Sequence, residues 1–134
     1  MPSMVITNVE TSTVLELEGG QFRDELLIFA GAGTVKRGTI LARVTASGKL
    51  TPFVIGGSLG AEIPKVVLTY DVTRAAAGDE PVRAMVKGTV NKNRLIVHAD
   101  GTGANITNAI LDLLRDYGIT PVDVANLGDY DTQD

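Results

Sequence analysis

The sequence predicts a mainly β (α+β) fold: a small β-sandwich or barrel-like domain of short strands, with one amphipathic helix near residues 104–117 and a flexible N-terminal arm. Three observations support this. Short apolar or β-branched runs alternate with glycine-rich turns over residues 26–97. One later segment repeats its apolar residues at helical spacing. The chain has 134 residues, of which 44% are hydrophobic, enough for one compact core.

The N-terminal arm, residues 1–24, sets apolar side chains into a polar background. Its apolar residues are Val5, Ile6, Val9, Val14, Leu15 and Leu17. Residues 13–18 alternate in part between polar and apolar, which is the period of a strand. Gly19 and Gly20 follow, and a glycine pair commonly interrupts an element. We therefore expect an edge strand or flexible arm that adds a strand to a sheet of a partner.

The strands of the main domain follow one another at short intervals. They are expected at residues 26–29, 39–44, 50–55, 65–72, 81–90 and 95–97. Residues 39–55 form a hairpin around the turn 46–49. Pro52 lacks an N–H group, so it marks the return strand as an edge strand or a broken one.

The helix near residues 104–117 is predicted from one apolar stripe. Its packing residues, at positions i, i+4, i+7, i+8 and i+11, are Ile106, Ile110, Leu113, Leu114 and Tyr117. Thr102 or Asn105 provides an N-cap oxygen. Gly118 is suited to the left-handed residue after the helix, and Pro121 prevents its continuation.

The charge is unevenly distributed. Residues 1–115 contain all 12 basic and 11 acidic residues, a sum of +1, and residues 116–134 contain five Asp, a sum of −5. We therefore divide the chain into an arm (1–24), a β domain (25–119) and an acidic C-terminal tail (120–134). The tail is expected to be a solvated terminus, with contact to a basic partner as the alternative.

Composition excludes several classes of function. The absence of Cys rules out disulfides, thiolate metal sites and cysteine nucleophiles, and the single His98 rules out a multi-histidine metal site in one chain. A net charge of −4 and only 4% aromatic residues argue against nucleic-acid binding. No apolar run approaches the roughly 18 residues of a membrane span. Residues 1–10 do not resemble a signal peptide, so we expect a protein that works or is assembled where it is made.

No group of residues supports catalysis or a cofactor. Residues 100–103 are glycine-rich but lack the Lys-Ser/Thr pair of a phosphate loop. Residues 84–87 are faintly similar to a biotin or lipoyl attachment site, but Val86 separates Met85 from Lys87. His98 has no partner for a catalytic triad and is expected to be structural. We expect no enzyme, no cofactor and no metal.

An ordered set of segments resembles the lambda-type bacteriophage head decoration (capsid cement) protein family. It runs from about Gly33 to Ile119 and comprises 38–44 with 48–50, the strand 66–72, the turn 77–79, the strand 81–84 with 88–91, and the helix end 115–119. Each segment alone is weakly specific, and their order and spacing carry the resemblance.

This resemblance implies a function as well as a fold. It implies a homotrimer on the outer surface of a phage head, made in the host cytoplasm, that binds the major capsid protein at local three-fold sites. Such a protein stabilises the expanded head against packaged-DNA pressure, and its arm orders on the shell. The alternative from the residues is a small β-barrel ligand-binding or carrier module, for which Lys87 would be the attachment site.

Overall fold

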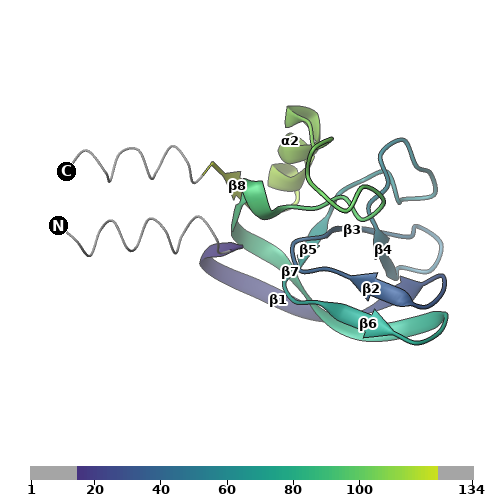
Figure 1. Ribbon diagram of the computed structural model, residues 1–134. Coiled ribbons are helices and arrows are strands. Elements are labelled where there is room, and N and C mark those ends of the chain that lie inside the picture. Colours follow the sequence, from purple (N-terminus) through teal and green to yellow (C-terminus); the bar gives the residue numbers. More distant parts are fainter. Residues whose placement is uncertain (1–14, 124–134) are drawn as a thin grey trace, which may run out of the picture.

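The computed structural model describes residues 15–123, and a five-stranded barrel forms its centre (Figure 1). The strands in chain order are β1 (Glu16–Phe29), β2 (Gly33–Val35), β3 (Ile40–Arg43), β4 (Leu50–Pro52), β5 (Val66–Leu68), β6 (Val72–Arg74), β7 (Gly78–Asn91) and β8 (Ile119–Val122). The helical elements are a 3-10 turn, η1 (Lys92–Arg94), and the helix α2 (Asn108–Asp116). The predicted mainly β fold with one short helix is confirmed.

The barrel closes because its first and last strands pair with each other. The order is β1-β4-β3-β5-β7, and β7 returns to β1. Strand β8 extends this sheet in parallel to β7, and β2 and β6 form a separate antiparallel ribbon. Since β4 has a neighbour on each side, the expectation of an edge strand at Pro52 is wrong. The alternative of a broken strand holds, because β4 ends at Pro52.

Strand β1 does not break at the glycine pair, which corrects the expected arm. It runs from Glu16 to Phe29 and pairs antiparallel with β7 on both sides of the glycine pair, with Gly20 opposite Gly88 and Gly19 within a register shift. Register shifts absorb the irregularity, and a Cβ atom on Gly20 would lie 3.0 Å from Met85 Cε, so this glycine permits a close approach. Residues 15–24 therefore belong to the barrel, and the expected boundary at residue 24 falls inside β1.

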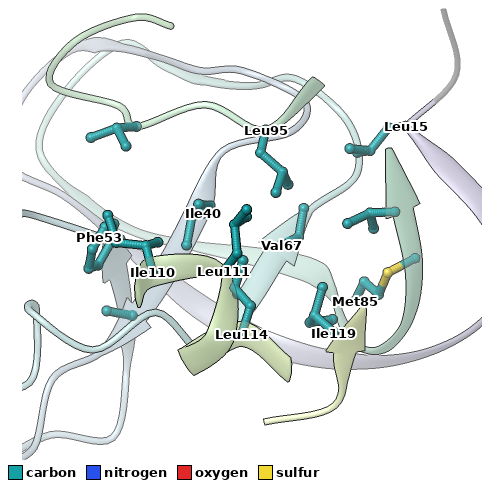
Figure 2. Packing of buried hydrophobic residues seen from close by; sticks show 13 residues of the cluster. Leu15, Ile40, Phe53, Val67, Met85, Leu95, Ile110, Leu111, Leu114 and Ile119 are labelled. Atoms are coloured by element: carbon teal, nitrogen blue, oxygen red, sulfur yellow. The ribbon is translucent and has the colours of Figure 1, made fainter. Parts of the chain in front are cut away.

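Two apolar cores lie on opposite faces of the barrel wall. The inner core takes side chains from all five barrel strands: Leu27, Phe29, Leu41, Leu50, Val66, Leu68, Val82 and Ala84. The outer core includes Ile40, Val67 and Met85 from the other face of the same strands, covered by α2 and β8 (Figure 2). Strands β3 and β5 are thus buried on both faces, which explains their apolar sequences, and β7 is buried on both faces at Ala84 and Met85.

Helix α2 covers the outer core with a different stripe from the predicted one. Ile110 and Leu114 are buried as expected, and Ile106 packs against the core from the preceding turn. Leu113 and Tyr117, however, are 38% and 43% exposed. Leu111 is buried in their place (Figure 2). At about 100° per residue, Leu113 lies about 100° from the centre of the buried face, beyond contact with the barrel.

The ends of the helix are only partly as expected. It begins after Thr107, whose hydroxyl accepts a hydrogen bond from Ile110 N at 3.4 Å, so the expected N-caps Thr102 and Asn105 are wrong. Gly118 has a φ of +100°, which confirms its predicted role after the last turn. Strand β8 follows at once, so residues 120–122 of the expected tail belong to the sheet.

Two other predicted strands differ in extent. The segment 65–72 splits into β5 and β6, because Tyr70 turns outward and its hydroxyl accepts a hydrogen bond from Arg83 N at 2.9 Å. The segment 95–97 forms only isolated bridges, Thr39 with Ile96 and Val97 with Thr102. In the first segment a side-chain hydrogen bond, and in the second two isolated bridges, stand in place of a continuous ladder of backbone hydrogen bonds.

The helix stripe yields a stability prediction. Leu111→Ala should lower the free energy of unfolding by about 2–5 kcal/mol, because it removes buried methyl groups and leaves a cavity. Leu113→Ala keeps the same helix propensity and should cost less than about 1 kcal/mol, because Leu113 is largely outside the core. Urea unfolding of both variants measures the difference. Equal losses would mean that α2 packs through the stripe expected from sequence.

Candidate functional site

The predicted arm residues divide into three groups. Val5, Ile6, Val9 and Val14 lie outside the described residues. Leu17 lies in β1. Leu15, which was expected to contact a partner, is fully buried in the outer core (Figure 2). Leu15 is therefore a core residue, and the arm can extend no further than residue 14.

Both ends of the described chain leave the barrel at the same place, the end of β7 (Figure 1). Asn91 N donates a hydrogen bond to Leu15 O at 2.7 Å, and Asn91 pairs with Val122 of β8 on its other side. Asp123 Oδ2 lies 4.0 Å from Lys92 Nζ. The described chain thus begins and ends beside Asn91.

Strand β1 offers an open sheet edge beside this place. Within residues 15–123, β4 is the strand that pairs with its second edge, at Leu27, so the edge from Glu16 to Asp24 has no strand neighbour. Phe22 and Leu26, on the same strand, are 41% and 40% exposed. An unpaired edge is a template for strand addition, and apolar side chains beside it suit a protein partner.

The edge of β8, by contrast, is closed to strand addition. Gly118 O accepts a hydrogen bond from Gly88 N at 3.1 Å, so alternation turns the backbone of Pro121 away from β7. Proline has no N–H to offer there, and Arg115 Nη2 donates to the Pro121 carbonyl at 3.4 Å. Of the two edges near the chain ends, only that of β1 is available to a partner.

A second exposed apolar surface lies in the loop between β4 and β5. Val54, Ile55 and Leu59, here termed the apolar tip, are 42%, 47% and 80% exposed. The sequence predicted Val54 and Ile55 to lie in the strand 50–55, whereas β4 ends at Pro52, and the tip was not identified. The available signal was three large apolar residues spaced among Gly56, Gly57 and Gly60.

One ion pair ties β1 to β3 across the short strand β4. Arg43 Nη1 and Nη2 reach the two carboxylate oxygens of Glu25, the second at 2.8 Å, and Arg43 Nη1 also donates to Gly48 O at 2.7 Å. The Arg43 hydrogen bonds lower the pKa of Glu25, and Glu25 in turn raises the pKa of Arg43. This bidentate pair fixes β1 at the point where its edge becomes free.

Several acidic side chains within residues 15–123 take part in ion pairs and hydrogen bonds that join elements of the fold. Among the described residues, no three His, Asp or Glu side chains gather as metal ligands. Asp79 pairs with Lys49 at 2.5 Å and Glu80 with Arg74 at 2.9 Å, while Asp71 accepts from Arg37 N at 2.7 Å. These carboxylates hold elements together rather than forming an acid–base pair.

The two other residues considered for chemistry are also placed. Lys87 lies within β7 rather than at a hairpin tip, as expected from sequence, so the geometry of an attachment site is lacking. His98 is exposed in a turn. The described part of the chain holds no helix with the length and apolar character needed to span a membrane.

The Glu25–Arg43 pair predicts a pH dependence of stability. The pKa of Glu25 is lower in the folded state than its ordinary value of 4.5. The ionised carboxylate therefore stabilises the fold at pH values above 4.5, and this stabilisation is lost as the pH falls through the folded-state pKa. The difference in unfolding free energy between wild type and Glu25→Gln should therefore shrink from about pH 7 to about pH 3. Urea unfolding at several pH values measures it.

The matched control is Asp24→Asn, which removes an exposed pair with Arg83 at 3.4 Å. Exposed pairs contribute little, so this variant should follow the wild-type pH profile. A Glu25→Gln deficit that stays constant with pH would contradict the assigned role of the carboxylate.

Comparison with known protein families gives a match. The family model for the bacteriophage lambda head decoration protein D matches residues 6–119. No curated protein matches the chain. The matched range covers the barrel, α2 and the first residue of β8, together with most of the segment before Leu15.

Proposed function

The chain belongs to the bacteriophage lambda head decoration protein D family, and from this premise we propose that it coats the expanded phage head as a trimer at local three-fold sites. Membership makes it a non-enzymatic structural protein that binds the capsid surface. The major capsid protein is its proposed partner there. The trimer, its position and its stabilisation of the head against DNA pressure are the proposed part.

The observation that supports the shell contact is the course of the chain into β1. The segment before Leu15 leads directly into a strand whose outer edge is unpaired as far as Asp24. We assign the shell contact to Val5, Ile6, Val9 and Val14, continued along this edge past Leu17. Main-chain hydrogen bonds to a shell strand would supply affinity, and the apolar side chains would supply specificity.

A trimer makes such a contact effective. Ordering an extended segment costs about 1–2 kcal/mol of backbone entropy per residue, so a single arm binds weakly. Three arms on one particle meet neighbouring sites at high effective concentration, which raises avidity by orders of magnitude without a new contact. By contacting neighbouring capsid subunits together, the trimer would resist their separation.

The tail is assigned a secondary role. Residues 120–134 lie beyond the matched range, and Asp129, Asp131 and Asp134 follow the exit of the chain beside Lys92. Residues 120–134 hold four acidic residues and no basic one, which suits contact with a basic surface of the shell as the alternative to a solvated terminus.

Deletion of the arm tests the proposal. A variant lacking residues 2–13 keeps Leu15 and β1, so it should fold with wild-type stability and yet fail to coat expanded heads. Co-sedimentation with heads that lack the protein measures coating, and thermal unfolding measures the fold. Undiminished coating by this variant would contradict the role of the arm.

Two controls separate binding from folding. Deletion of residues 2–18 removes Leu15 and the start of β1, so it should lose stability as well as binding. A full-length variant with Val5, Ile6 and Val9 replaced by Asp should reproduce the loss of coating, whereas Ala at Thr7, Asn8 and Thr11 should not.

A further inference from the structure

The apolar tip is held rigidly in a conformation that its own sequence disfavours. Leu59 is a non-glycine residue with a φ of +59°, in the left-handed region. Its carbonyl accepts a hydrogen bond from Thr45 N at 3.0 Å, and Val54 N donates to Ala61 O at 2.9 Å. Gly60 holds the loop against β3, because a Cβ there would lie 2.1 Å from Arg43 O.

Neither the left-handed conformation of Leu59 nor the exposure of its side chain favours the folded state of a single copy. Glycine at position 59 would relieve the backbone strain, and a polar residue would avoid exposing a leucine that is 80% accessible. A fixed, exposed apolar group of this kind is typical of a surface that another molecule covers.

The same chain carries a pocket of matching character. Its volume is about 440 Å³, and it lies where Ile28 and Phe29 end β1, beside Gly31, Pro52 and His98. None of its lining residues is Asp, Glu, Lys or Arg, and the segment 53–60 that bears the tip is equally free of charge. The pocket is large enough for a leucine side chain and its neighbours.

We propose that the apolar tip of one copy seats in this pocket of the next copy, and that three such contacts close the trimer. The inference rests on the proposed function, which supplies the trimer. A three-fold ring requires two different surfaces that fit each other, since each copy meets one neighbour through each surface. The tip residues Val54, Ile55 and Leu59 do not line the pocket, so one chain carries two different surfaces that meet that requirement.

The position of the two surfaces favours a second copy over the shell as the partner. The loops that join β3, β4 and β5 lie at the end of the barrel away from the start of β1 and from β8 (Figure 1). The arm assigned to the shell enters at the opposite end. The chain thus separates contact with the shell from contact between copies.

Cysteine cross-linking between two variants tests the contact, since the natural chain has no cysteine. Leu59→Cys and Gly31→Cys are purified separately, mixed, and bound to expanded heads before treatment with a short bismaleimide. Gly31 has open space around its Cβ position, so its substitution should leave the fold intact. We expect a covalent dimer of this chain in the mixture and none with either variant alone.

The other outcomes overturn the proposal in distinguishable ways. Dimers from Leu59→Cys alone would mean that tips meet each other. A benzophenone attached to Leu59→Cys that labels the capsid protein would assign the tip to the shell. The contact would be excluded if no adduct formed in this mixture or in a second mixture, of Leu59→Cys with Ala32→Cys at the neighbouring pocket position. Leu113→Cys, another exposed apolar site, replaces Leu59→Cys in the control mixture, which should give no dimer.

Failure of the proposed function would appear separately, as wild-type protein that does not coat heads. In that case the mixture of Leu59→Cys and Gly31→Cys is cross-linked in concentrated solution without heads, and the presence or absence of the covalent dimer tests the contact between copies by itself. As a second measurement, Leu59→Asn keeps a residue that tolerates the left-handed conformation. It should unfold at the same temperature as wild type or higher, yet coat heads about tenfold more weakly, as expected for loss of one buried leucine side chain. Wild-type coating by Leu59→Asn would overturn the proposal.

Discussion

The pairing of β1 with β7 is the constraint on which the rest of the structure depends. These two 14-residue strands lie far apart in the sequence and pair from Glu16 with Val90 to Phe29 with Gly78. Their ladder closes the barrel, separates the inner core from the outer one, and brings both ends of the described chain to Asn91. Because the strands are long, one ladder runs from the end of the barrel at Phe29 and Gly78 to the end where the described chain begins.

The sequence predicted those features that local patterns determine. The hairpin of β3 and β4 follows from apolar runs around a turn, and the C-terminus of α2 follows from Gly118. The start of β1 could not be predicted, because its partner strand is remote and overrides the local preference of Gly19 and Gly20. Leu111 was missed for a related reason: one apolar stripe does not show which of its flanks meets the barrel.

The docking features show the same limit. The apolar residues of the arm can be identified in the sequence, but only the structure shows that Leu15 is buried in the outer core. The apolar tip depends on Leu59 adopting a left-handed conformation, which nothing about leucine suggests. Hydrogen bonds from Thr45 and the close contact of Gly60 with β3 impose that conformation, and both come from another part of the chain.

The contrast between the two sheet edges near Asn91 bears on crowding. Many copies of a coat protein are concentrated on one particle, where open strand edges invite runaway polymerisation into cross-β fibres. Pro121 and Arg115 remove that hazard along β8, while β1 remains open. Growth of the six-stranded sheet through successive copies needs an open edge on both sides of every unit, so a sheet that is open along β1 and closed along β8 can join one neighbour and then stop.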